Sequence, residues 1–210
     1  MLITFDRLIP YFESKPVTGA LHIGAHAAEE LPGYLSCGID SIIWIEANPH
    51  MASTLFSKTF AHVGSTLIFC AAYNEDDVAV MLNVANNGES SSLLNFDEHT
   101  KEHPHIHFTG QVEVPAYTID TIFKRKGFDR PKFNFANIDI QGAELIALSG
   151  MEEQLKHLDY VYLEVNEKHL YENCALIGDI DMFLSHRGFE RAITEMTKHG
   201  WGDALYTRKD

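Results

Sequence analysis

The chain has 210 residues, which is enough for one α/β domain with a substantial core and too few for two comfortable domains. Apolar residues make up 45% of the sequence and charged residues 22%, as is usual for a globular enzyme. The net charge of −14 argues against non-specific binding to nucleic-acid phosphates or to an anionic membrane surface. We therefore expect one domain over residues 1–210 that binds neither nucleic acid nor membrane.

The cysteines and the N-terminus indicate where the protein works. Cys37, Cys70 and Cys174 are far apart and show no Cys-x-x-Cys spacing. An odd, sparse set of cysteines is typical of a reducing compartment and not of a disulfide framework. The N-terminus lacks the basic segment of a signal peptide, and no apolar run approaches the roughly 18 residues of a membrane span. The sequence therefore predicts a cytoplasmic protein.

In chain order, the first predicted element is a short amphipathic helix, which makes residues 1–16 an N-terminal helical extension. Apolar runs then alternate with helical patterns. Strands are expected at 17–23, 41–46, 67–72 and 78–84, the last as an added edge strand. Helices are expected at 27–37 and from Pro49 to about residue 60.

Residues 86–110 are the least regular part of the chain. A connection of this length in a compact domain is either disordered or functional. We expect it to form an irregular insertion on the substrate side of the domain.

The second half of the chain continues the alternation. Strands are expected at 111–116, 133–138, 160–165, 189–196 and 204–208. Helices are expected at 119–126, after residue 142 and before Gly188. This alternation predicts a mostly parallel sheet with helices on both faces. The last two strands have no helix between them, so they predict an antiparallel hairpin at one edge.

The most informative segment is a predicted strand that stops at an acidic residue. The apolar run 133–138 is typical of a strand covered on both faces, and it is followed by Asp139. Gly142 permits a turn, and a helical pattern resumes after it. A carboxylate at the carboxyl end of a parallel strand lies where open α/β sheets bind their ligands. The alternative is that Asp139 only caps a turn or helix.

A second motif places a glycine turn before a helix. The segment 22–26 contains Gly24, and about 20 residues later the strand 42–46 ends at Glu46. Strand, glycine turn, helix, strand and acid form the unit that binds a nucleotide at a helix N-terminus and its ribose on the acid. The alternative role of Glu46 is to cap the helix that begins near Pro49.

These segments resemble the S-adenosylmethionine-dependent methyltransferases of the FkbM family, from about Val17 to about Tyr206. The motifs that carry the resemblance are His22-Ile-Gly-Ala-His26, Trp44-Ile-Glu-Ala-Asn-Pro49, Thr118-Ile-Asp120, Asn137-Ile-Asp-Ile-Gln-Gly-Ala-Glu144 and Tyr162-Leu-Glu-Val-Asn166. The family usually has an acid at the position of His22 and Asn or Gly at that of His26. The resemblance implies an α/β, Rossmann-like class I methyltransferase fold: a mostly parallel seven-stranded sheet, helices on both faces and an antiparallel C-terminal edge hairpin.

The resemblance also implies a set of S-adenosylmethionine contacts at the strand ends. The expected cofactor-binding residues are His22, Gly24, Ala25, His26, Glu46, Ala47, Ala71, Ala72 and Asp139. Glu46 is expected to accept hydrogen bonds from the ribose hydroxyls, and the small side chains of Ala71 and Ala72 leave room for the adenine.

Two of these residues are also catalytic candidates. Asp139 either holds the positively charged end of the cofactor or accepts the proton of an attacking substrate hydroxyl. His26 is a second candidate base, because its ordinary pKa is near 6.5, and otherwise it contacts the cofactor only.

The expected acceptor is a small molecule or glycan with a hydroxyl group. Polar residues suited to bind it are Ser91, Ser92, Gln141 and Glu144, although Glu144 is equally suited to act as an acid in the first helical turn. His99, His103, His105 and His107 are dense enough to suggest a metal site. We nevertheless expect a solvated or substrate-facing loop and no metal, since the sequence does not show the hydrogen-bond partners that metal-binding histidines need.

The sequence leaves other functions open. A dinucleotide-dependent oxidoreductase is disfavoured because residues 24–29 lack the second and third glycines of a pyrophosphate loop. A methyltransferase-like domain that binds without turnover stays an alternative, because the fold alone does not determine activity. Whether the protein forms a homo-oligomer is also open.

Overall fold

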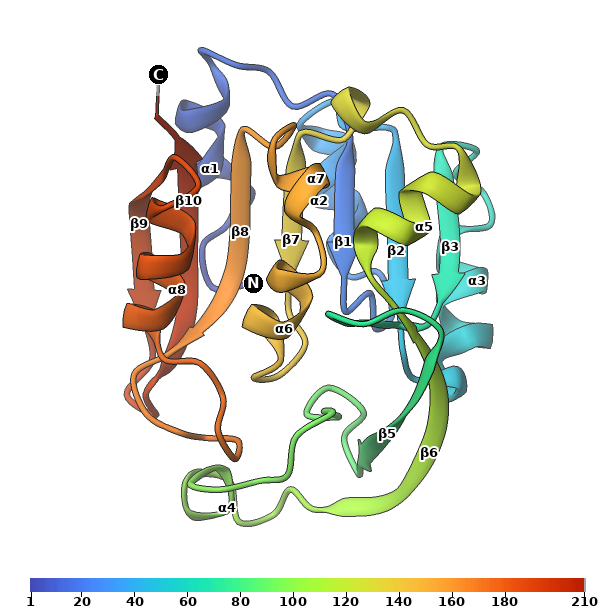
Figure 1. The fold of residues 1–210 in the computed structure, drawn as a ribbon, viewed down its shortest axis with the longest axis vertical. Coiled ribbons are helices and arrows are strands. Elements are labelled where there is room, and N and C mark those ends of the chain that lie inside the picture. Colours follow the sequence, from blue (N-terminus) through green and yellow to red (C-terminus); the bar gives the residue numbers. More distant parts are fainter. Residues whose placement is uncertain (210) are drawn as a thin grey trace.

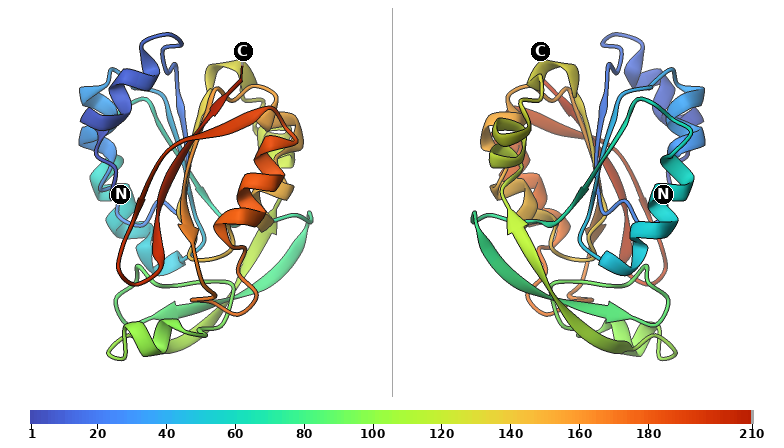
Figure 2. Two further views of the ribbon diagram at one scale, coloured as in Figure 1. Left: turned by 90° about the vertical axis from the view of Figure 1, so that its left-hand side faces the viewer. Right: turned by 90° about the vertical axis from the view of Figure 1, so that its right-hand side faces the viewer.

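The computed structural model, which describes residues 1–209, is built around a seven-stranded sheet with helices on both faces (Figures 1 and 2). The strand order is β3-β2-β1-β7-β8-β10-β9. The strands are β1 (Ala20–Ile23), β2 (Ile42–Glu46), β3 (Ser65–Phe69), β7 (Phe135–Ile138), β8 (Tyr160–Asn166), β9 (Phe189–Met196) and β10 (Trp201–Arg208). The first five are parallel, and β10 is antiparallel to both β8 and β9. The predicted fold, including the edge hairpin, is confirmed.

Alternation along the buried strands divides the core into two layers. In β1, Leu21 and Ile23 face one layer, whereas Ala20 faces the other. The first layer is covered by α5 (Ile119–Lys126), α6 (Glu144–Ser149), α7 (Glu152–Leu155) and α8 (Ile177–Ser185). The second is covered by α1 (Phe5–Phe12), α2 (Leu31–Ser36) and α3 (Ala52–Thr59). The two groups of helices lie on opposite sides of the sheet in Figure 2.

The first helix after the glycine turn is shorter than predicted. Helix α2 begins at Leu31, whereas the sequence pattern predicted a start at 27. His26 and Ala28 have positive φ angles of 42° and 53°, so residues 26–28 do not belong to a right-handed helix. The predicted helix from Pro49 is also divided, into the 3₁₀ turn η1 (Pro49–Met51) and α3.

The predicted strand 67–72 is split between two sheets. Strand β3 ends at Phe69, and β4 (Ala71–Ala72) pairs with β6 (Phe108–Tyr117). Strand β5 (Val78–Ala85) pairs antiparallel with the other side of β6, so it is the edge of this second sheet and not of the main one. The second sheet lies beyond the carboxyl ends of the parallel strands, at the bottom of Figure 1.

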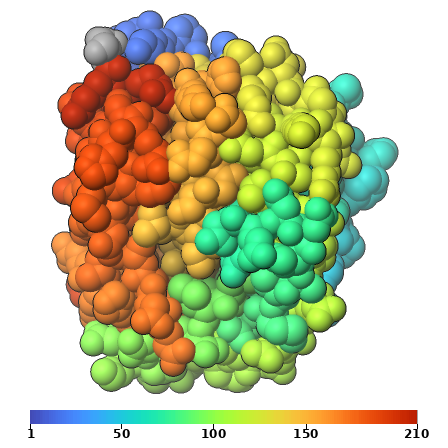
Figure 3. All heavy atoms as spheres, viewed as in Figure 1, coloured from blue at the N-terminus to red at the C-terminus, as the bar shows by residue number. Residues whose placement is uncertain are grey.

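The irregular insertion connects β5 to β6. It contains α4 (His99–Glu102), and the predicted strand 111–116 extends back to Phe108. Isolated bridges join Asn83 to Ser92 and Phe96 to Tyr171. In the space-filling view of Figure 3 this green segment fills the lower end of the molecule. The insertion therefore closes the side of the sheet at which its parallel strands end.

Helix α5 matches its predicted bounds because both of its ends are marked locally. The Thr118 side chain accepts a hydrogen bond from the Thr121 amide, and Gly127 follows the helix with a φ of +68°. Among residues 1–209, no helix is both long and apolar enough to cross a bilayer.

Candidate functional site

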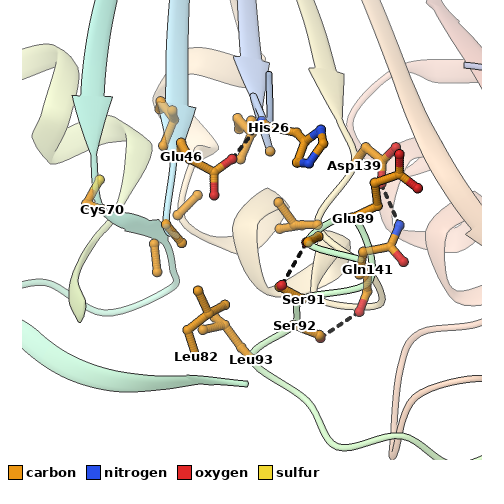
Figure 4. A pocket seen from close by; sticks show the side chains of 18 residues that line it. His26, Glu46, Cys70, Leu82, Glu89, Ser91, Ser92, Leu93, Asp139 and Gln141 are labelled. Carbon is orange, nitrogen blue, oxygen red and sulfur yellow. Dashed lines mark hydrogen bonds between the residues drawn. The ribbon is translucent and has the colours of Figure 1, made fainter. Parts of the chain in front are cut away.

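Two adjoining cavities lie at the carboxyl ends of β1, β2 and β7. The first, which we call the inner cavity, is shown in Figure 4. It is lined by Ile23, Gly24, His26, Ile45, Glu46, Ala47, Cys70, Ala71, Ala72, Leu82, Gly88, Glu89, Ser91, Ser92, Leu93, Asp139, Ile140 and Gln141. The structure thus brings together most of the residues that the sequence predicted for the site.

The glycine turn lies against the end of β7. Gly24 has a φ of +91°, and a Cβ atom there would fall 1.8 Å from the carbonyl oxygen of Asp139. Any other residue at this position would therefore push the two strand ends apart. Ala25 is 1% exposed and packs in the core beside α2, so it does not line the inner cavity.

Glu46 lies at the rim of the inner cavity and is 8% exposed. Its two carboxylate oxygens accept hydrogen bonds from the backbone amides of His26, at 2.7 Å, and Asn48, at 2.6 Å. Burial raises the pKa of Glu46 despite these bonds. The side chain of Asn48, and not that of Glu46, caps the following 3₁₀ turn by accepting from the His50 amide. Glu46 therefore ties β2 to the glycine turn.

One end of the inner cavity is apolar and the other is polar. Cys70, Leu82 and Leu93 lie at the apolar end, where small side chains leave space (Figure 4). Burial raises the pKa of the Cys70 thiol to about 12, so it is neutral at physiological pH and unsuited to act as a nucleophile. Asp139 and Gln141 are at the opposite end. A flat apolar ring with a charged tail would fit this division.

The two histidines of the glycine motif have different surroundings. His26 lines both cavities, and its Nδ1 lies 2.9 Å from Oε1 of Glu29. His22 is 2% exposed, with Nδ1 2.9 Å from the Tyr34 hydroxyl and its ring beside Trp44. Burial lowers the pKa of His22, which favours a neutral ring. His22 lines only the second cavity, because alternation along β1 directs it towards α2.

Gln141 is the centre of the polar end. Its φ is +58°, and its Nε2 donates to Asp139 Oδ1 and to Glu164 Oε2, each at 2.8 Å. Its Oε1 accepts from the Tyr171 hydroxyl at 2.6 Å, and its carbonyl accepts from Ser92 Oγ at 2.7 Å. Four segments of the chain therefore meet at one amide side chain and its backbone.

Glu144 supports the turn that presents Gln141. It is 2% exposed and lines neither cavity, and its Oε1 accepts from the amides of Ile140 and Gly142, each at 3.1 Å. Burial raises the pKa of Glu144 to about 7, and the neighbouring Asp139 adds to the rise. The structure places Glu144 behind the turn, as a structural acid at the start of α6.

Asp139 is an exposed carboxylate with other acids nearby. It lines both cavities and remains accessible to solvent through them. Partial withdrawal from bulk water raises the pKa of Asp139 to about 6, opposed by the bond from Gln141 and increased by Asp203. A carboxylate with this pKa is ionised at neutral pH and is more basic than an ordinary aspartate.

Ser91 and Ser92 line the inner cavity from the side of the insertion. Ser91 Oγ donates to the Gly88 carbonyl at 2.7 Å and accepts from the Ala85 amide at 3.1 Å. The bond from Ser92 to Gln141 joins the insertion to the turn after β7, whereas the bonds of Ser91 stay within residues 85–91.

The second cavity, which we call the outer cavity, opens beside the inner one and shares Gly24, His26, Glu89, Asp139 and Gln141 with it. Six carboxylates line it: Glu29, Glu30, Glu89, Asp139, Glu164 and Asp203. Glu164, Asp203 and Tyr171 were not among the site residues predicted from the sequence. Glu164 could have been found, because it lies in the motif Tyr162–Asn166 at the end of a buried strand. Asp203 lies on an edge hairpin and carried no local signal.

The histidine-rich segment contributes side chains to the outer cavity. His99, His103 and His105 line it, whereas His107 does not. The His99 ring stacks on Phe96 with a centroid distance of 4.2 Å. Within residues 1–209, no three or more His, Cys, Asp or Glu side chains are grouped so as to hold a metal ion.

A family model supports the chemistry that these cavities suggest. The model described as the methyltransferase FkbM domain matches residues 22–191 of this chain. No curated protein matches the sequence significantly.

Solved structures share the fold at low sequence identity. A magnesium protoporphyrin IX methyltransferase from Synechocystis PCC 6803, with bound S-adenosylmethionine, has a TM-score of 0.52 and 10% identity over 98% of this chain and 78% of that one. An S-adenosylmethionine-dependent methyltransferase from Aquifex aeolicus has a TM-score of 0.51 and 12% identity over 99% and 90%. A proposed tRNA (m1A22) methyltransferase from Streptococcus pneumoniae, in complex with S-adenosylmethionine, has a TM-score of 0.50 and 13% identity over 91% and 66%. At these identities the likeness shows the fold alone.

Proposed function

The chain belongs to the FkbM methyltransferase family and is an S-adenosylmethionine-dependent methyltransferase, and from this premise we propose that it methylates a hydroxyl group of a sugar, glycan or secondary metabolite. Membership of this family argues against the alternative function of a dinucleotide-dependent oxidoreductase. The observation that carries the proposal is a carboxylate, Asp139, held where the inner cavity meets the outer one.

The inner cavity fits the cofactor. Gly24 keeps the turn free of a Cβ atom at the approach of β1 to β7, and Ala47, Ala71 and Ala72 line the cavity with small side chains. Each Glu46 oxygen accepts one backbone hydrogen bond, which leaves further acceptor capacity for ribose hydroxyls. We propose Gly24, His26, Glu46, Ala47, Ala71, Ala72 and Asp139 as the cofactor-binding residues.

Two further residues of the expected cofactor set are less well placed. Ala25 is buried in the core, and His22 faces only the outer cavity. Ala25 could contact the cofactor only with its backbone in the glycine turn, and His22 could do so only across the outer cavity.

S-adenosylmethionine supplies an electrophilic methyl group on a sulfonium. For this chain we propose that Asp139 accepts the proton of the acceptor hydroxyl, since a positioned base typically adds about 10²- to 10⁴-fold to the rate. Gln141 holds Asp139 by its 2.8 Å bond, and Glu144 holds the turn behind it. Alignment of the acceptor and exclusion of water by the insertion would supply the remainder of the rate enhancement. His26, which also lines both cavities, is the second candidate base.

The acceptor would enter through the outer cavity. Gln141 lines it directly, whereas Ser91 and Ser92 line only the inner cavity and Glu144 neither one. Trp201 offers an aromatic surface there to a sugar ring. Nucleic acid is disfavoured as acceptor because the chain carries a net charge of −14. The single-domain organisation and a cytoplasmic location remain predictions.

The proposal is tested by assaying formation of S-adenosylhomocysteine with a panel of hydroxylated sugars and metabolites. Methylated product identified by mass spectrometry as an ether would support it. Binding of S-adenosylmethionine without turnover on any acceptor would favour a domain that has lost catalysis. Transfer to a ring nitrogen of RNA would overturn the choice of acceptor.

A further inference from the structure

The outer cavity has a strongly one-sided charge. Four of its carboxylates, Glu29, Glu30, Glu164 and Asp203, line it without lining the inner cavity. No lysine or arginine among residues 1–209 lines the outer cavity. These four acids are therefore not explained by the proposed contacts to the cofactor.

Glu29 Oε1 lies 2.9 Å from Nδ1 of His26, whereas the other three acids have no basic side chain of the described chain within hydrogen-bond distance. Glu164 accepts from the Gln141 amide, and Asp203 accepts from the Tyr162 hydroxyl and the Leu2 amide, all neutral donors. Glu30 has the ammonium of Met1 at 3.9 Å and Nε2 of His22 at 4.0 Å. Burial lowers the pKa of His22, so this ring favours its neutral form and compensates little of the negative charge.

The crowding of acids has an electrostatic cost. Burial raises the pKa of Glu164 well above its ordinary value, and the nearby carboxylates of Asp139, Glu144 and Asp203 raise it further. A cation placed among these groups would relieve their mutual repulsion, whereas an anion would increase it.

A histidine that lines the outer cavity provides an independent indication of a ligand. His99 lines the outer cavity and is 5% exposed, and its Nδ1 has no hydrogen-bond partner among residues 1–209. Burial lowers the pKa of His99 to about 4, so the ring is neutral near pH 7. A neutral imidazole nitrogen accepts a hydrogen bond from an N–H or O–H donor, and buried polar atoms are rarely left without one.

We propose that the outer cavity binds an acceptor that carries a protonated amino group beside its hydroxyl, as an amino sugar or amino alcohol does. This inference rests on the proposed function and specifies its substrate class. The ammonium lies among Glu30, Glu164 and Asp203, and His99 accepts a hydrogen bond from the same ligand. An acceptor with a carboxylate or phosphate is rejected by the same acids.

The test compares three probes of one size. Glucosamine, glucose and glucuronate are titrated calorimetrically, at low salt and pH 7, into protein saturated with S-adenosylhomocysteine. We expect glucosamine to bind about tenfold or more tightly than glucose, as a charged hydrogen bond would give, and glucuronate to bind most weakly.

Charge-neutralising variants locate the effect. The double variant Glu30→Gln/Glu164→Gln should lose the preference for glucosamine, whereas Glu113→Gln, which removes an exposed carboxylate that lines neither cavity, should keep it. S-adenosylhomocysteine should bind all three proteins alike, which also verifies folding. Equal binding of glucosamine and glucose, tightest binding of glucuronate, or a preference that survives in the double variant would overturn the inference.

Magnesium ion is titrated as a further competitor. If magnesium displaces glucosamine at a concentration below that of glucosamine, the inference would also be overturned. Failure of the proposed function is recognised separately. It would appear as absent binding of S-adenosylhomocysteine, and the probe series on unloaded protein would still decide the charge preference of the outer cavity.

Discussion

The substitution Asp139→Asn separates the possible roles of the carboxylate between the two cavities. The Gln141 Nε2 atom donates to Asp139 Oδ1 at 2.8 Å, and the Oδ1 atom of asparagine accepts the same bond. The substitution therefore preserves shape and the main contact while it removes the charge. If Asp139 accepts the proton of the acceptor, we expect kcat to fall by about 10²-fold or more with cofactor binding nearly unchanged.

The pH dependence of the rate provides a second readout. Because the pKa of Asp139 is raised to about 6, the base is protonated and inactive below that pH. The wild-type rate should rise by about tenfold per pH unit below 6 and level off above it. The variant should lose this rise. If Asp139 instead holds the charged cofactor, S-adenosylmethionine should bind the variant more weakly, and S-adenosylhomocysteine, with its neutral sulfur, should lose less.

Binding by calorimetry and single-turnover rates on one preparation distinguish these outcomes. Asp129→Asn is the matched control, because this exposed aspartate lines neither cavity. Wild-type binding, rate and pH profile in Asp139→Asn, together with a loss of thermal stability, would refute the reasoning and leave Asp139 as a turn cap.

Three further predictions concern the cofactor contact, the buried acid and the histidine-rich segment. Glu46→Ala should weaken S-adenosylmethionine binding by about 1.5–3 kcal/mol, measured by calorimetry, because charged hydrogen bonds to the ribose are lost; an unchanged dissociation constant would remove Glu46 from the site. Glu144→Gln keeps an Oε1 acceptor for both turn amides. Denaturant unfolding should show a free energy of unfolding about 1–2 kcal/mol higher than that of the wild type at pH 8, and this difference should disappear towards pH 4.5. Burial raises the pKa of Glu144 in the folded state to about 7, above its value in the unfolded state, so the wild-type protein loses stability as pH rises between these two values. A difference between variant and wild type that does not change with pH would contradict this explanation. A chelator should leave methyl transfer intact, and reversible loss restored by a divalent ion would revive a metal-assisted mechanism.

Local patterns were sufficient for the sheet and for the inner cavity. Buried strands, glycine turns and the acids at strand ends can each be recognised in a short stretch of sequence. The positions of Gly24, Glu46 and Asp139 at the strand ends could therefore be predicted from spacing alone. Their meeting at one edge follows from parallel strand direction, because carboxyl ends of neighbouring parallel strands share an edge. Helix α5 matched its bounds for the same reason, since Thr118 and Gly127 mark its ends locally.

Contacts between distant segments explain where the predictions failed. Helix α2 starts late because the amide of His26 bonds to Glu46 at the end of the neighbouring strand, in a turn with positive φ angles. The strand at 67–72 divides because Ala71 pairs with Ala116 in the second sheet. Neither the late start of α2 nor the division of the strand can be read from hydrophobic periodicity, because each depends on a partner that lies 20 or more residues away in the chain.

The amino-acid sequence by itself determined the fold class, the family and the carboxylates at the ends of β2 and β7, because these depend on strand patterns and turn residues. Only the tertiary structure decided that Gln141 joins Asp139 to Glu164, and that Glu144 lies behind the turn and not in a cavity. It also brought Asp203 from the edge hairpin to the same wall. Side-chain direction at a turn depends on backbone φ and on partners from other strands, and neither is encoded in the spacing of residues along one segment.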